Sequence, residues 1–131
     1  MTIFDAIGIA GTGVTTNRKW MDAISDNMAN LNTAVSTGSD AFQARYVIAK
    51  EAGDGKGVQV GGIALGSAEG RMVYEPDHPL ADEAGYVKYP DIDMGTQMTS
   101  LLMAQRAYQA NLAVVDRAKE AYQAALQLGK G

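Results

Sequence analysis

Apolar residues recur at alternating spacings of three and four near both ends of the chain, but not in its middle. One such stripe covers residues 3–31 and a second covers residues 94–126. The spacing averages about 3.5 residues, the repeat that keeps one face of an α-helix against a partner helix. The pattern predicts a helix over 3–31 and another over 92–128, with Gly129 as its C-cap. We expect these two helices to pair as an antiparallel, coiled-coil-like hairpin.

The apolar surface of the C-terminal stripe is too wide for one partner helix. Residues 94–128 include twenty apolar and five charged residues, and a two-helix hairpin cannot cover that much apolar surface by itself. Neighbouring subunits are therefore predicted to cover the remainder. The predicted subunit interface consists of Ile7, Val14, Asn17, Met21, Ile24, Met28, Leu31, Met98, Leu101, Leu102, Tyr108, Leu112, Val115, Tyr122 and Leu126.

Polar and small residues interrupt the two stripes. Asn17, Gln105 and Lys119 occupy stripe positions, where a polar side chain can fix the register of helix pairing at some cost in stability. The other interpretation, equally open from the sequence, is that these side chains face solvent. The glycines within 8–13 follow the order G-x-x-G-x-G, which departs from the dinucleotide-binding fingerprint. Close packing of helix backbones is the favoured explanation for them.

In the middle of the chain the apolar period changes to two. Alternation over 42–48 predicts a strand, the turn Gly53–Gly57 follows it, and Val58 begins a returning strand, so this part is expected to form a hairpin. Two further short extended segments are predicted at 71–74 and 86–89. Proline residues break regular structure between these two segments.

The predicted fold is mainly α-helical with a small β insert. A chain of 131 residues fits one ordinary domain. Residues 1–33 and 92–131 are expected to form its helical core, and residues 34–91 a linker and a β-hairpin-rich middle segment with long loops. The small, polar stretch 34–40 is predicted to be a flexible link.

Composition narrows the possible functions. The net charge of −4 gives no electrostatic reason to expect nucleic-acid binding, and the absence of cysteine excludes disulfides and Cys-ligated zinc. No apolar run approaches the roughly 20 residues of a membrane span. A cleaved secretory signal is not expected, because Asp5 lies where a basic segment belongs and the first basic residue is Arg18.

Candidate chemical sites are sparse. Asp77, His78, Asp82 and Glu83 form the only cluster of a histidine with carboxylates. A committed metal site usually has two or more converging His or Cys side chains, so a solvated or interface loop is favoured over metal binding. With one histidine and no cysteine, most nucleophile–base arrangements are unavailable. No catalytic, cofactor or metal residues and no small-molecule substrate are predicted.

An asparagine-rich helix end carries a family resemblance. The segment Ser25–Thr33 matches the pattern S-x-N-[ILM]-A-N-x-N-T. This pattern is typical of the axial proteins of the bacterial flagellum, and the chain resembles the basal-body rod family among them. The matching residues are Asn27, Ala29, Asn30, Asn32 and Thr33.

Two further segments resemble the proximal-rod members of this family. Residues 73–90 resemble Y-[DE]-P-x-H-P-x-A-[DN]-x-x-G-Y-V-x-x-P, and residues 106–111 resemble R-[AS]-Y-[EQ]-A-N. The residues that carry these motifs are Pro76, His78, Pro79, Asp82, Gly85, Tyr86, Arg106, Tyr108 and Asn111. The link 34–41 departs from the family, which has a short Gly-Pro segment before a basic pair. Only Arg45 remains of that pair.

The resemblance implies a structural subunit rather than an enzyme. Rod proteins are exported by the flagellar type III apparatus without signal cleavage and stack into a torque-transmitting drive shaft across the periplasm, with their terminal helices around the export channel. The implied partners are other copies of the chain, other proximal-rod subunits, the distal-rod protein, the base protein linking the rod to the MS ring, and the export apparatus. Two other hypotheses are a soluble helical adaptor and a small hydrolase using Asp77, His78 or Asp82.

Overall fold

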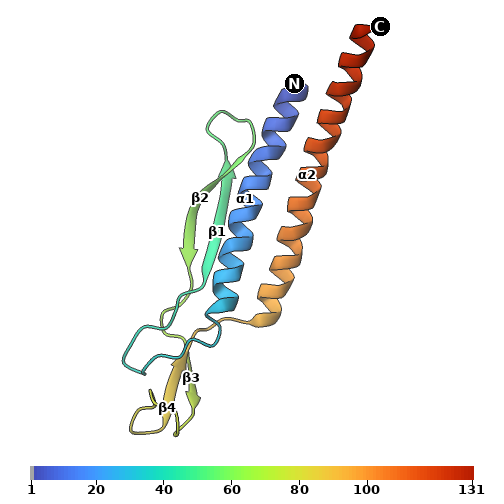
Figure 1. Ribbon diagram of the computed structural model, residues 1–131. Coiled ribbons are helices and arrows are strands. Elements are labelled where there is room, and N and C mark those ends of the chain that lie inside the picture. The colour runs from blue at the N-terminus through green and yellow to red at the C-terminus, as the bar shows by residue number, and fades with distance from the viewer. Residues whose placement is uncertain (1) are drawn as a thin grey trace.

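The computed structural model describes residues 2–131 as two long helices and four short strands (Figure 1). In chain order these are α1 (Ile3–Ala29), β1 (Arg45–Glu51), β2 (Val58–Leu65), β3 (Arg71–Tyr74), β4 (Tyr86–Tyr89) and α2 (Met94–Lys130). The predicted fold class, mainly α-helical with a small β insert, is confirmed. Met1, the first residue of the predicted segment 1–33, lies outside the described residues.

Helix α1 lies at the centre of the molecule. Helix α2 runs antiparallel along one side of it, and the β1–β2 hairpin lies along another side (Figure 1). The β3–β4 hairpin forms the end of the molecule opposite to the two chain termini (Figure 1). Neither helix of the described chain is both long and apolar enough to cross a bilayer. Within residues 2–131, α1 therefore has neighbours on two sides, whereas the only element packed along α2 is α1.

Side chains cap both helices at their first turns. Thr2 Oγ1 accepts a hydrogen bond from the Asp5 N–H at 3.2 Å, and Asp5 Oδ2 accepts one from the Thr2 N–H at 2.9 Å, which completes a capping box. Asp93 caps α2 by accepting from the Thr96 N–H at 2.7 Å. The prediction that Gly129 caps α2 is wrong, because α2 continues beyond it. A glycine in an exposed helical turn costs only about 1 kcal/mol and need not end the helix.

Two contacts define how the helices are aligned with each other. Gly13 of α1 faces the side chain of Asn111 on α2, and Asn27 Nδ2 donates a hydrogen bond to Gln97 Oε1 at 3.1 Å. These two contacts are 14 residues apart on α1 and 14 residues apart on α2. Equal spacing on the two helices keeps the same helix faces in contact along the pair.

The α2 residues that pack against α1 are shifted by one position from the predicted stripe at two places. Ala104 and Ala118 are buried, whereas Gln105 and Lys119, which occupy predicted stripe positions, are exposed. A small side chain permits a shorter distance between helix axes than a large one does, so the helix pair uses the alanines. Within the described chain, Gln105 and Lys119 face solvent, while Asn17 is half-buried.

The glycines of α1 differ in what surrounds them. A Cβ atom at Gly13 would lie 2.7–2.9 Å from atoms of the Asn111 side chain, which is closer than real Cβ contacts. Gly8 and Gly11 have no such neighbour within 4 Å. The predicted close packing is therefore confirmed for Gly13 and wrong, within the described chain, for the other two glycines.

The strands form two separate antiparallel hairpins. In the first, Arg45 of β1 lies opposite Leu65 of β2, and Glu51 lies opposite Val58. The Thr12 hydroxyl of α1 accepts a hydrogen bond from the Val58 N–H at 3.1 Å, which ties the start of β2 to the helix. The second hairpin joins β3 to β4. Both the predicted hairpin and the two predicted short extended segments are confirmed, although β1 begins three residues later than the alternation indicated.

The link 34–40 is held in place rather than flexible, so this expectation was wrong. Val35 and Lys88 of β4 exchange two backbone hydrogen bonds of 2.9 and 3.0 Å. The Thr37 hydroxyl donates to Asp82 Oδ2 at 3.1 Å. The partners lie 45 or more residues away in the chain. Local composition therefore gives no sign of them.

Replacing Gly13 with alanine is expected to lower the free energy of unfolding by about 1–3 kcal/mol, because the added methyl group must displace Asn111 or separate the helices. Urea unfolding followed by circular dichroism measures the change. Gly11→Ala is the matched control, since it has open space and should raise stability by about 0.5–1 kcal/mol. Equal effects of the two substitutions would contradict the assigned helix contact.

Candidate functional site

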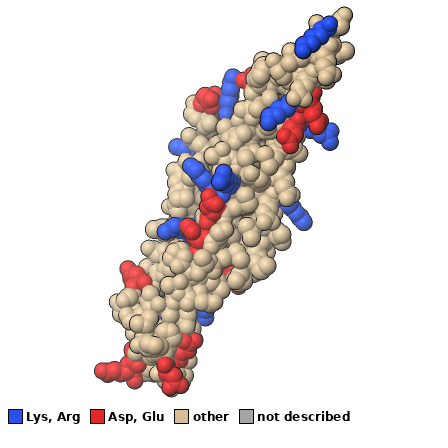
Figure 2. Space-filling view, viewed as in Figure 1, with Lys and Arg blue, Asp and Glu red and all other residues tan. Residues whose placement is uncertain are grey.

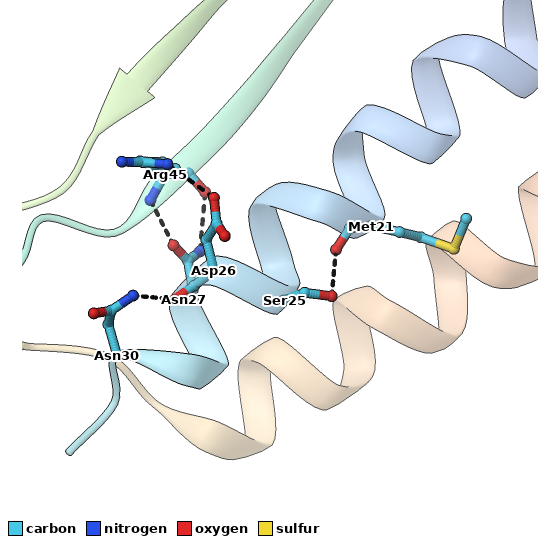
Figure 3. Close-up of polar contacts among 6 residues, drawn as sticks. All are labelled: Met21, Ser25, Asp26, Asn27, Asn30 and Arg45. Carbon is cyan, nitrogen blue, oxygen red and sulfur yellow. Dashed lines mark hydrogen bonds and ion pairs between the residues drawn. The ribbon is translucent and has the colours of Figure 1, made fainter. Parts of the chain in front are cut away.

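The side chain of Asn27 joins three elements at the end of α1. Its Nδ2 donates to the carbonyl oxygen of Arg45 at 2.9 Å and to Gln97 Oε1 at 3.1 Å, and its Oδ1 accepts from the Arg45 N–H at 2.7 Å. The amide thus pairs with both backbone groups of the first residue of β1, as a neighbouring strand would (Figure 3). Asn27 is fully buried, so every one of these bonds replaces water.

The other polar residues of the asparagine-rich motif shape the helix end around this joint (Figure 3). The Arg45 guanidinium forms an ion pair with Asp26 at 2.8 Å. Asn30 Nδ2 donates to the carbonyl oxygen of Asp26 at 2.9 Å, and the Thr33 hydroxyl donates to Asn30 Oδ1 at 3.2 Å. The remaining motif residues, Ala29 and Asn32, are exposed. In this chain the motif terminates a helix and fastens a strand to it.

The loop between β3 and β4 is organised by its own polar side chains. His78 Nδ1 accepts a hydrogen bond from the Leu80 N–H at 3.0 Å. Asp82 Oδ1 accepts from the N–H groups of Ala84 and Tyr86 at 3.0 and 2.9 Å. These bonds, with that from Tyr86 the largest cause, hold the pKa of Asp82 below its usual value. Across residues 2–131, no three His, Cys, Asp or Glu side chains are grouped closely enough to hold a metal ion.

Gly85 closes this loop in a backbone conformation that favours glycine, with φ of 86°. A Cβ atom there would lie 2.7 Å from the ring of Tyr74. The rings of Tyr74 and Tyr86 meet edge-on, with centroids 5.3 Å apart. Pro76 and Pro79 are exposed. The structure therefore brings most residues of the second motif into one ordered loop at the tip of the molecule.

The predicted interface residues fall into three groups. Ile24 is buried, and Met98, Leu102, Tyr122 and Leu126 are exposed. The half-buried residues are Ile7, Val14, Asn17, Met21, Met28, Leu31, Leu101, Tyr108, Leu112 and Val115. The exposed members are apolar side chains on α2 that this chain leaves uncovered. Of the third motif, Arg106 is exposed and Asn111 is half-buried.

Sequence reasoning missed Gln97 as a site residue. It is polar yet only 3% exposed, because its side chain accepts the hydrogen bond from Asn27. Its position four residues before Leu101 on the stripe was the available signal. A polar residue was not expected there because counting the stripe from Met94 favoured Met98.

Comparisons with known proteins agree with the motifs. A family model described as flagellar basal body rod FlgEFG protein C-terminal matches residues 83–128. The flagellar basal-body rod protein FlgC of Salmonella typhimurium is 31% identical over 134 residues, which cover 99% of this chain and 100% of that protein. The chain belongs to the FlgC family of flagellar basal-body rod proteins. FlgC of Escherichia coli O157:H7 is 32% identical and that of Bacillus subtilis 27%, each over 99% of this chain and 100% of the relative.

In this FlgC-family chain, Asn27→Ala is expected to lower the free energy of unfolding by about 3 kcal/mol. The substitution removes the hydrogen-bond partner of the buried Gln97 side chain and of the part-buried Arg45 backbone groups. Asn32→Ala in the same motif is the control and should change stability by less than about 0.5 kcal/mol, because Asn32 is exposed. Urea unfolding measures both, and similar losses would disprove the special role of Asn27.

Asp82 is expected to make part of the stability of this FlgC-family chain depend on pH. Its pKa lies below the usual 3.8 in the folded protein. The contribution is therefore fully present above that value and is lost as the pH falls through the lowered pKa. Thermal unfolding of the chain and of Asp82→Asn at several acidic pH values measures it. The difference between the two should shrink as the pH falls, and a constant difference would contradict this assignment.

Proposed function

We propose that this chain is a structural subunit of the flagellar basal-body rod that polymerises through its two terminal helices and carries out no catalytic step. The observation that carries the proposal is the apolar surface that α2 leaves exposed. Met98 and Leu102 are 53% and 56% exposed, and Leu128 is 83% exposed. Large exposed apolar patches mark protein–protein interaction sites. The full-length similarity to proteins named FlgC supports the rod as the assembly concerned.

The length of α2 supports polymerisation. The rings of Phe4 and Tyr122 meet edge-on near the first turn of α1, with centroids 5.3 Å apart. The eight residues of α2 that follow Tyr122 therefore extend past the end of α1 (Figure 1). Leu126 and Leu128 on this extension are exposed. Helices in proteins gain most of their stability from tertiary packing. This extension lacks such packing in the single chain, and a second subunit would supply it.

The pairing of α1 with α2 is proposed to be coiled-coil-like. The equal spacing of 14 residues between the Gly13 and Asn27 contacts on both helices supports this geometry. Gln105 and Lys119, which are exposed in the single chain, would then act on the register between subunits rather than within one. Asn17 is half-buried beside Trp20 in a groove along β1, so it could act on register within the subunit or between subunits.

The family supplies the remaining parts of the proposal. The subunit would be exported by the flagellar type III apparatus without a cleaved signal, and would lie in the periplasmic span of a drive shaft that transmits torque around an export channel. Its partners would be other copies of itself, other proximal-rod subunits, the distal-rod protein and the base protein that joins the rod to the MS ring. Similarity over the full length of FlgC relatives supports this placement.

The double substitution Met98→Glu/Leu102→Glu is expected to abolish incorporation of the chain into basal bodies while leaving the subunit folded. Both side chains are exposed in the single chain, so the carboxylates meet water there. In an apolar subunit contact they would lose several kcal/mol of hydration. Isolated basal bodies probed for the chain, together with swimming in soft agar, measure the effect, and circular dichroism checks the fold.

Met98→Leu/Leu102→Met is the matched control for that experiment. It keeps the apolar character and approximate volume at both positions, and it should preserve incorporation and swimming. Normal incorporation of the glutamate variant would contradict polymerisation through this face of α2. It would favour the helical adaptor instead.

A further inference from the structure

The outer face of the β3–β4 hairpin is an aromatic surface that this chain leaves uncovered. Met72, Tyr74 and Tyr86 are 54%, 63% and 41% exposed. Tyr74 lies opposite Tyr86 and Met72 lies opposite Lys88, so these side chains share one face of the hairpin. Val87, on the opposite face, has no exposed surface. The hairpin therefore packs one face on the protein and presents the other to solvent.

The same region carries the whole net charge of the chain. Residues 66–91 contain six acidic and two basic residues, a net charge of −4, and the rest of the chain contains nine of each sign. Figure 2 shows Asp and Glu side chains gathered at the end of the molecule that β3 and β4 form. The ion pairs within residues 2–131, Arg45–Asp26 and Lys56–Asp5, lie outside this region. None of these six carboxylates is neutralised by an ion pair in the described chain.

Two carboxylates of the loop between β3 and β4 remain available to a partner. Glu75 accepts a hydrogen bond from the Tyr89 hydroxyl at 2.9 Å, and Asp82 binds the N–H groups of its own loop. Asp77 and Glu83 are exposed, and their side chains form no hydrogen bond or ion pair within residues 2–131. The bonds of Asp82 order the loop that carries both. An ordered surface loses little conformational entropy on binding.

We propose that this acidic aromatic face, defined by Met72, Tyr74, Tyr86, Asp77 and Glu83, docks a protein other than this chain. The partner's contacting surface is rich in Lys and Arg around an apolar centre. Tyrosine is enriched at the centres of protein interfaces, and charge complementarity selects a basic partner. A second copy would offer either the same negative face or a body with no net charge. An anionic lipid surface would be repelled.

The test places the photoreactive residue p-benzoyl-phenylalanine at position 74 of the full chain, in the cells that make it. Irradiation is expected to give an adduct with a different protein, whose crosslinked peptide carries an excess of Lys and Arg. Adding Asp77→Lys/Glu83→Lys should lower the adduct yield about tenfold, because like charges then face each other. The control Asp22→Lys/Glu51→Lys makes the same charge change at exposed positions on α1 and β1. It should leave the yield within about twofold.

An adduct with a second copy, no adduct at all, or equal yields from the two charge-reversal variants would overturn the proposal. This inference rests on the proposed rod function, because the chain is expected to meet this partner in the rod. Incorporation of the chain into isolated basal bodies is therefore measured on the same samples. Normal incorporation without the expected adduct would overturn this inference alone, whereas an unmodified chain absent from basal bodies would overturn the rod function itself.

Discussion

The buried amide of Asn27 is the interaction on which the rest of the structure depends. It bonds to both backbone groups of Arg45 and to the side chain of Gln97, so one side chain sets where β1 begins and where α2 lies against α1. Asn27 and Gln97 are both buried, and leaving a buried polar group unpaired costs about 1–3 kcal/mol. Sliding either helix by one residue would break this pairing, which makes the joint a device for uniqueness as well as for stability.

The consequences of this joint extend along the helix pair. Fourteen residues away on both helices, Gly13 meets Asn111, and the absence of a Cβ atom there leaves room for the Asn111 side chain. A polar bond at one level and a steric fit at another specify the same alignment. Apolar burial alone specifies register poorly because it is non-directional. The structure thus adds directional and steric constraints to an apolar stripe that would otherwise allow several alignments.

The sequence predicts the two helices and the two hairpins because their periods are properties of consecutive residues. The sequence does not predict contacts between residues far apart in the chain, or positions where the size of the side chain decides which residue is buried. Ala104 and Ala118 are buried between the helices. A stripe counted through the large apolar residues of α2 passes instead through the neighbouring positions 105 and 119. The link 34–40 looked flexible, because nothing local reveals that Val35 pairs with Lys88. The motif around Asn27 was recognised by resemblance, but its physical role became visible only in the fold.

The chain keeps two kinds of exposed surface apart. Exposed apolar residues such as Leu102 and Leu128 lie along α2. The acidic residues without ion-pair partners gather at the end of the molecule that β3 and β4 form. Apolar burial supplies most of the free energy of association but discriminates weakly among partners, whereas charge favours some partners and repels others. If this end of the molecule docks a basic partner as proposed, a charged surface held away from the helices by an ordered loop gives the subunit a means of choosing one neighbour without weakening the proposed contacts along α2.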